Sequence, residues 1–319
     1  LEPLSRRKPI MNKGRIKTVT GWIEPNQITG CYVHEHLFAR ATPEIVNENP
    51  NMAVTGLQEV GYDLREFKNL GGNCVVDTTT VDYGRDLGKL NELSKHNGVF
   101  IIGCGGFNKG KFNRSFLEFE ELNEVVRRIH EDVLAEVGVG VVKIGTSLNS
   151  IEEWELKGLK AISEVHKITG VPITTHTEKG TFGLEQLALF KREGVHPSAI
   201  IIGHIDQNPD FEIHKRIIQQ GAFIGYDSVA KAKYKTKDRA IEFIIQFAKI
   251  GLHKQIVISG DFARKDYYKG YGGEPGLRYL LSDFKTELRA RLLENELDAE
   301  SIVNDLFINN PARALAFRF

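Results

Sequence analysis

The stretch VGVVKIGTS at residues 139–147 is rich in valine and isoleucine, and its apolar residues do not alternate with polar ones. Such runs are typical of strands that are buried on both faces in a parallel sheet. Similar runs occur along the whole chain, at 28–33, 73–79, 98–106, 171–177, 199–206, 222–227 and 255–262. The sequence therefore predicts eight strands.

Longer amphipathic stretches between these runs predict helices. Apolar residues recur every three or four positions in 56–70, 116–134, 151–169, 181–194 and 239–251. Residues 275–318 are predicted to be further helix with a break at Pro311. Eight strands that are each followed by helix indicate the α/β class and a single (β/α)8 TIM barrel. A doubly wound open sheet is the alternative, but no GxGxxG follows the first strand, and a dinucleotide site is unsupported.

The composition of the 319-residue chain limits its partners. Lys and Arg together number 42, as do Asp and Glu, so we expect a small-molecule substrate and no nucleic-acid or membrane partner. Three cysteines without a CxxC spacing suit a reducing compartment, and we expect a cytoplasmic protein for which a homodimer is one candidate assembly. Residues 1–10 are expected to be an added or disordered arm, and residues 11–319 to form one domain.

The segment YVHEHLF at residues 32–38 places His34 and His36 two residues apart at the end of the first predicted strand. Alternate residues of a strand lie on one face, so the two imidazoles would stand side by side while Glu35 points the other way. In a barrel, the residues at the carboxyl ends of the strands line a common mouth. The histidine pair alone is weak evidence for a metal site, so the residues at the other strand ends must also be considered.

These other strand ends extend the cluster. His176 and His204 end the fifth and sixth predicted strands, Asp261 ends the eighth, and Lys143 lies within the fourth. Four imidazoles and a carboxylate suit Zn²⁺, with Mn²⁺, Co²⁺ or Fe²⁺ as alternatives. Five side chains are too many for one tetrahedral ion, so we expect two divalent ions. The six other histidines fall in helical or loop segments, where we expect surface or structural roles.

Motifs spread along the chain resemble those of the phosphotriesterase family, and more closely its phosphotriesterase-like lactonase branch within the amidohydrolase superfamily. They are HEH at 34–36, VVKIGTS at 141–147, PITTHTEKGT at 172–181, IIIGHIDQNPD at 200–210, GDFARKDYYKGYGG at 260–273 and NNPARALAF at 309–317. The resemblance runs from about residue 16 to the end and includes every metal motif in order. It implies a metal-dependent hydrolase domain.

The resemblance also implies how the metal ions are held. In this family the lysine of the fourth strand is carbamylated by CO2 and bridges two ions together with a hydroxide. The implied ligands are His34, His36 and Asp261 for one ion, His176 and His204 for the other, and Lys143 as the bridge. An unmodified ammonium would repel the cations, whereas a carbamate offers an oxygen to each. Asp261 would accept the proton of the attacking hydroxide and deliver it to the leaving alkoxide, so Asp261 and Lys143 are the catalytic candidates.

The loops after the seventh and eighth strands are expected to select the substrate. Many acyl-homoserine lactonases of this branch have an LDR sequence after strand seven, but Ser228 stands at the arginine position here. Loops in these positions often bind phosphate in TIM barrels, and lysine and arginine are natural phosphate partners. The expected substrate-binding residues are Arg264, Lys233, Lys231, Tyr226 and Tyr268. For Lys235 and Lys237 we prefer a solvated surface role.

These features favour a hydrolase that opens small polar lactones, with a phosphorylated sugar lactone as the expected substrate. The alternative is phosphotriester or carboxylester hydrolysis, because the same hydroxide could attack those esters. A non-catalytic metal-binding barrel is the least favoured interpretation, since no metal motif is missing.

Overall fold

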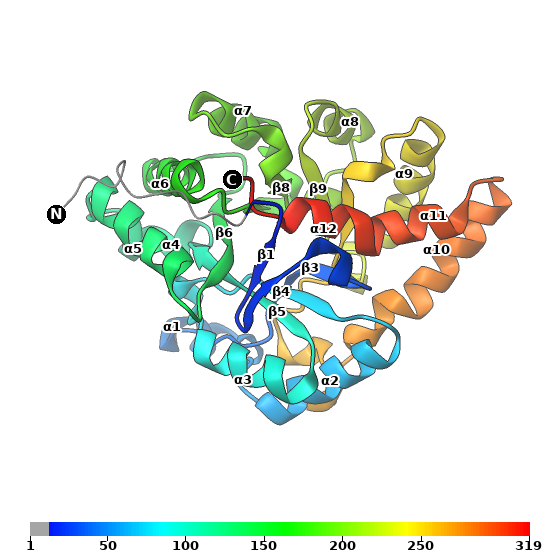
Figure 1. The fold of residues 1–319 in the computed structure, drawn as a ribbon, viewed down its shortest axis with the longest axis horizontal. Coiled ribbons are helices and arrows are strands. Elements are labelled where there is room, and N and C mark those ends of the chain that lie inside the picture. The colour runs from blue at the N-terminus through cyan, green and yellow to red at the C-terminus, as the bar shows by residue number, and fades with distance from the viewer. Residues whose placement is uncertain (1–12) are drawn as a thin grey trace.

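The computed structural model describes residues 13–319 as a parallel sheet rolled into a nearly closed barrel and wrapped by helices (Figure 1). The barrel strands are β3 Cys31–Glu35, β4 Cys74–Asp77, β5 Phe100–Gly106, β6 Val139–Thr146, β7 Ile173–Thr177, β8 Ile200–Ile202, β9 Phe223–Tyr226 and β10 Ile256–Ile258. Neighbouring strands follow chain order from β3 to β10, and all their pairings are parallel. The predicted (β/α)8 barrel is confirmed. The expected arm at residues 1–10 lies outside the described residues.

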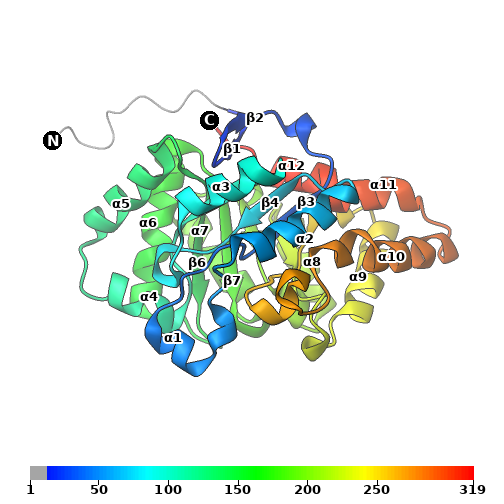
Figure 2. The ribbon, with the colours of Figure 1, turned by 90° about the horizontal axis from the view of Figure 1, so that it is seen from below.

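Helices cover the outside of the barrel (Figures 1 and 2). They are α1 Pro43–Glu48, α2 Leu57–Asn69, α3 Leu87–Asn97, α4 Gly110–Leu117, α5 Leu122–Leu134, α6 Glu153–Thr169, α7 Gly183–Arg192, α8 Phe211–Gln219, α9 Lys237–Lys249, α10 Asp283–Glu294, α11 Ala299–Asn304 and α12 Asn310–Leu315. The single helix predicted over 116–134 is instead the end of α4 and all of α5. Phe119, which contributed to the predicted apolar face, is 87% exposed in the connection between them. Within 13–319, no helix is both long and apolar enough to cross a membrane.

The helical segment near the C-terminus does not break at Pro311. α11 continues into a π-helical turn over Asp305–Asn309, and α12 follows with Pro311 in its first turn. Proline lacks an N–H, and its ring collides with the carbonyl four residues earlier in a regular α-helix. We infer that the wider π turn relieves this collision, so the chain stays helical where a break was predicted.

An antiparallel hairpin that the sequence did not predict covers one end of the barrel. Its strands are β1 Ile16–Thr18 and β2 Gly21–Ile23. The backbone N–H of Val19 donates to the carbonyl of Ile101 at 2.8 Å, and Lys17 Nζ donates to the carbonyl of Ala135 at 2.7 Å. Figure 2 shows this hairpin and α1 at opposite ends of the barrel. The carboxyl ends of the strands therefore form the open mouth.

Two apolar layers make the core, one between the strands and the helices and one inside the barrel. The inner layer contains all three cysteines, which are buried and unpaired. Val141 belongs to this layer, and Lys143 follows two residues later on the same face of β6. The apolar filling of the barrel thus gives way to polar side chains towards the mouth.

The seam between the first and last strands, β3 and β10, is closed largely by side chains. The Oγ of Ser259 accepts from the backbone N–H of His34 at 2.8 Å. Glu35 is fully buried, and its carboxylate accepts from the N–H groups of Gly260 at 2.6 Å and Phe262 at 2.8 Å. These contacts fasten the end of β10 to the strand that carries the histidine pair.

Candidate metal centre

Four histidines from three strands meet at the mouth of the barrel. The ring centroids of His34 and His204 lie 4.7 Å apart, those of His176 and His204 lie 4.3 Å apart, and those of His34 and His36 lie 6.0 Å apart. His34, His36 and His204 are buried, and the side chain of His176 is 16% exposed. The structure therefore brings together all four histidines that the sequence singled out.

A register shift in β3 accounts for the direction of its two histidines. The pairing between β3 and β4 shifts between Tyr32 and Glu35, which marks a bulge or irregularity. Val33 lies in the apolar interior, so strict alternation would turn His34 outward. The shift lets His34 and His36 face the mouth while Glu35 points to the seam, as the sequence predicted.

Asp227, at the end of β9, orients two of the histidines. Its Oδ1 lies 2.6 Å from Nδ1 of His204, and its Oδ2 lies 3.5 Å from Nδ1 of His34. Each of the two histidines therefore turns its Nδ1 towards the carboxylate of Asp227. The Nε2 atoms of both rings remain for a metal ion, a common arrangement for metal-binding histidines.

The other two histidines are oriented by their own partners. Nδ1 of His36 lies 2.8 Å from Oγ1 of Thr79, so its Nε2 turns to the centre. His176 is reversed, because its Nε2 lies 3.0 Å from Oε2 of Glu178 and its Nδ1 is the nitrogen left for a metal. Burial lowers the pKa of His36 to about 4 and holds the pKa of His176 well below its usual value. Both rings are therefore neutral near pH 7, as a metal ligand must be.

Asp261 supplies a carboxylate beside the histidine pair. Its Oδ1 lies 3.4 Å from Nε2 of His36 and 3.9 Å from Nε2 of His34, and the three side chains form a compact potential metal-binding group. The Nζ of Lys231 contacts its other oxygen. Burial alone would raise the pKa of Asp261, but the Lys231 ammonium and the histidines hold it well below its usual range. This carboxylate is therefore ionised at neutral pH.

Lys143 lies under the histidines and is 1% exposed. Its Nζ is 3.3 Å from Nε2 of His34 and 3.4 Å from the carbonyl of Thr78. Within the described part of the chain, no carboxylate forms an ion pair with it, and burial lowers its pKa. Four imidazoles, one carboxylate and a buried amine without an ion-pair partner among the described residues together fit a site for divalent cations.

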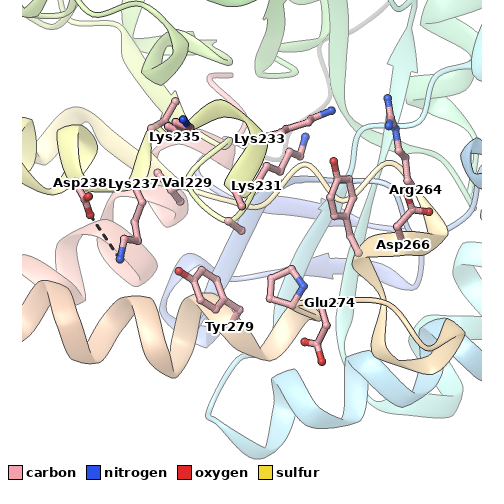
Figure 3. A pocket seen from close by; sticks show the side chains of 15 residues that line it. Val229, Lys231, Lys233, Lys235, Lys237, Asp238, Arg264, Asp266, Glu274 and Tyr279 are labelled. Atoms are coloured by element: carbon pink, nitrogen blue, oxygen red, sulfur yellow. Dashed lines mark ion pairs between the residues drawn. The ribbon is translucent and has the colours of Figure 1, made fainter.

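A cavity of about 810 Å³ lies between the loops that follow β9 and β10, and one of its lining residues, Lys231, contacts Asp261. Lys231, Lys233 and Arg264 line it, and Figure 3 shows their side chains extending towards the same side. Burial lowers the pKa of Lys233, and the charges of Arg264 and Lys231 lower it further. The three cations therefore form a compact positive group that suits an anion.

The structure separates the expected substrate-binding residues. Lys233, Arg264 and Lys231 all line the cavity, and Lys231, which is 4% exposed, also contacts Asp261. Tyr226 and Tyr268 do not reach the cavity, because both side chains are fully buried. Tyr226 lies on the outer face of β9, 2.8 Å from His214, because alternate strand residues face the helices.

The position of Tyr268 has a different physical reason. Its hydroxyl donates to the backbone carbonyl of His36 at 2.8 Å, which fixes the end of β3. Tyr267, its neighbour, lines the cavity instead. Of the two lysines expected at the surface, Lys237 turns away from the cationic group and pairs with Glu287 at 2.7 Å, and Lys235 is exposed.

Buried carboxylates tie the loops of the mouth to neighbouring strands through backbone N–H groups. The Oδ2 of Asp77, for example, accepts from the N–H groups of Leu37 at 2.6 Å and Phe38 at 3.1 Å. We call this set the rim carboxylates: Glu35, Asp77, Asp82, Glu155, Asp206 and Asp227. Burial raises the pKa of Asp77 to about 6. These contacts hold the ligand-bearing loops in place.

Sequence reasoning missed three residues of the site. Asp227 ends β9, so the rule that named Asp261 at the end of β10 could also have found it. Glu178 follows β7, and Lys109 follows β5 and forms an ion pair with Glu178. Nothing in the sequence pairs these two residues, because their loops are far apart along the chain.

The barrel fold and the cluster of histidines with Asp261 are typical of one class of enzymes, the barrel enzymes that bind divalent metal ions at the carboxyl ends of their strands. The sequence matches the phosphotriesterase family over residues 14–315, and the chain belongs to this family of metal-dependent hydrolases. It is therefore an enzyme, as the sequence predicted.

Several relatives are similar along most of their length. The phospho-furanose lactonase of Mycoplasmopsis synoviae is 29% identical over 94% of this chain and 91% of its own. The crystal structure of a lactonase from Listeria monocytogenes superimposes with a TM-score of 0.90 at 32% identity, covering 96% of this chain and all of that one. The phosphotriesterase homology protein of Escherichia coli, whose crystal structure has phosphate in the active site, gives a TM-score of 0.85 at 25% identity, with 92% of this chain covered.

Proposed function

We propose that the protein hydrolyses small polar lactones and that its substrate is a phosphorylated sugar lactone. The observation that carries this proposal is the cationic group of Lys231, Lys233 and Arg264 in a cavity beside the candidate metal centre. An anion bound there would lie next to the reacting centre without belonging to it. The lactonase relatives, and the phosphate in the active site of the Escherichia coli relative, support the same assignment.

The proposed cofactors are two divalent ions, with Zn²⁺ as the preferred metal. His34, His36 and Asp261 would hold one ion, and His176 and His204 would hold the other. Lys143 would be the ligand shared by both ions, because its buried amine has no ion-pair partner among the described residues, and reaction with CO2 would turn it into an anionic carbamate with release of a proton. Ions bound there would lower the pKa of water and polarise the lactone carbonyl.

The side chains of the protein then have separate tasks. Asp261 is ionised and lies between His36 and Lys231, so its carboxylate can accept the proton of the attacking water and return it to the ring oxygen that leaves. Arg264 and Lys233 hold the phosphate, away from the bond that breaks. Because the alcohol stays tethered in a lactone, the product is a hydroxy acid.

A lactone library with and without phosphate groups tests the proposal. We expect the wild-type enzyme to prefer phosphorylated sugar lactones over their unphosphorylated analogues. A lack of preference for phosphate would contradict the substrate assignment but leave the metal centre standing.

The second candidate function is phosphotriester hydrolysis. It is favoured by similarity to the aryldialkylphosphatase of Saccharolobus solfataricus, which is 28% identical over 75% of this chain. The cationic cavity argues against a neutral aryl ester as the main substrate. Faster hydrolysis of paraoxon-type esters than of any lactone would reverse this order.

A further inference from the structure

The ion pair of Lys109 and Glu178 lies directly against one histidine of the centre. Oε2 of Glu178 is 3.0 Å from Nε2 of His176, and the same oxygen contacts Nζ of Lys109. The carboxylate therefore connects a cation on the β5 loop to a metal-binding ring on β7. Neither residue touches the cationic group that we assign to phosphate.

The packing around the pair is close and depends on a glycine. A Cβ placed on Gly145 of β6 would lie 2.7 Å from Cβ of Lys109 and 3.1 Å from Cβ of His176. Any side chain there would push the two residues apart. On the other side, Nε2 of Gln186 donates to the backbone carbonyl of His176 at 2.9 Å. The backbone of His176 is thus held independently of Glu178, which acts on the ring.

Glu178 resembles Asp227 in its contact but differs in its surroundings. The side chain of Asp227 is 1% exposed, and its position is fixed by the backbone N–H of His204. The side chain of Glu178 is 27% exposed and sits on a short turn, Glu178–Gly180. A carboxylate with that freedom needs a second restraint to hold a ring, and the Lys109 ammonium supplies it.

We propose that Glu178 is a positioning residue for the ion held by His176 and His204, and that Lys109 holds Glu178 in place. The carboxylate accepts the proton of His176 Nε2, which fixes the tautomer that offers the lone pair of Nδ1 to the ion. Loss of such a partner typically weakens metal binding roughly 10–100-fold. The inference rests on the proposed two-ion centre, but it concerns one ion only.

The test compares the full-length wild-type protein with Glu178→Ala, Glu178→Gln and Lys109→Met. Zn²⁺ content is measured by elemental analysis after equilibration in a graded series of chelator buffers, which yields two dissociation constants. Glu178→Ala should weaken one ion roughly 10–100-fold and leave the other unchanged. Glu178→Gln keeps an acceptor oxygen, so its affinity for this ion should fall less than that of Glu178→Ala. Lys109→Met keeps Glu178 itself and should also show a smaller fall in affinity.

Glu164→Ala is the matched control, because Glu164 pairs with Lys167 on α6 and has no contact with the centre. It should change neither constant. NMR of histidine labelled with ¹⁵N gives an independent readout, since the N–H signal of His176 Nε2 should disappear or shift in Glu178→Ala but stay unchanged in Glu164→Ala.

Three outcomes would overturn the inference. Unchanged dissociation constants in Glu178→Ala would show that Glu178 does not position His176. An equal loss of both ions, or a lower melting temperature of the metal-free variant, would show that Glu178 has a general structural role instead. A wild-type protein that holds only one ion would overturn the two-ion centre itself, which separates the two failures.

Discussion

At the scale of single residues, Lys143 is unusual because a buried amine is costly unless its charge is removed or paired. It lies 3.3 Å from Nε2 of His34 and has no carboxylate partner within the described residues. A lysine in this position contributes little to stability as an ammonium. The carbamate that we propose would explain the buried lysine, because it would turn the amine into a metal ligand.

Replacing Lys143 with alanine should remove both metal ions and abolish activity. The affinity for the ions should fall by more than the roughly 10–100-fold expected when a ligand loses its hydrogen-bond partner, because the proposed bridging ligand itself is removed. Adding a short carboxylic acid such as propionate should restore part of the activity. Lys17→Met is the control, because Lys17 is also buried but binds carbonyl groups at the opposite end of the barrel.

Arg264→Ala should affect only substrates that carry phosphate. A charge-assisted hydrogen bond contributes about 1.5–3 kcal/mol, so kcat/KM for a phosphorylated lactone should fall by about one to two orders of magnitude. The phosphate does not react, so the loss should appear mainly in KM. Lys237→Met is the control within the same cavity, since Lys237 already pairs with Glu287. Equal losses on phosphorylated and unphosphorylated lactones would show that Arg264 supports the fold instead.

At the scale of elements, the eight strands could be predicted because strands buried on both faces leave unbroken apolar runs in the sequence. The β1–β2 hairpin was missed because its strands have only three residues each and carry no such run. The division between α4 and α5 was missed because Phe119 has an apolar side chain in a helical register yet faces solvent. The spacing of apolar residues indicates which residues share one face of a helix. It does not indicate whether that face packs against the protein or is exposed to solvent.

The positions of the candidate metal ligands could be predicted for a related reason. Each one lies within a barrel strand or no more than three residues after one, so the barrel places it at the mouth. The expected substrate residues Lys231, Lys233 and Arg264 lie on loops, where no alternation applies, so the sequence could not show which of the two lysines points inward. Tyr226 could have been excluded by alternation, since Phe223 faces the interior of the barrel and Tyr226, three residues later, faces the helices.

The seam between β3 and β10 gives a prediction about an element. Glu35→Gln replaces one acceptor oxygen with an NH2 group that opposes the N–H of Gly260 or Phe262. The free energy of unfolding should fall by about 1–3 kcal/mol, the cost of a buried group without a partner. Urea unfolding of the metal-free protein measures this change. Glu131→Gln, an exposed partner of Arg127, is the control and should stay within about 0.5 kcal/mol of wild type.

At the scale of the whole molecule, His214 should make stability depend on pH. Burial lowers its pKa to about 4, and its neutral ring suits Tyr226 and the carbonyl of Asn208 as partners. Below about pH 6.5, His214 binds a proton in the unfolded chain but stays neutral in the folded protein. The free energy of unfolding therefore decreases as the pH falls from about 6.5 towards 4.

The size of this effect can be isolated with one variant. The wild type should lose up to about 3 kcal/mol more than His214→Gln over that interval. Chemical unfolding of the two proteins between pH 4 and pH 7 measures the difference. Parallel pH profiles would show that His214 is protonated in the folded protein.

The rim carboxylates have a consequence for the exchange of backbone hydrogens with solvent. Amides in loops usually exchange quickly, because they have no stable acceptor. Here the N–H groups of Leu37, Phe38, Gly260 and Phe262 are held by buried carboxylates. In deuterated water, these four amides should exchange as slowly as those of the strands. The mouth of the barrel would then be a rigid surface that the substrate meets already formed.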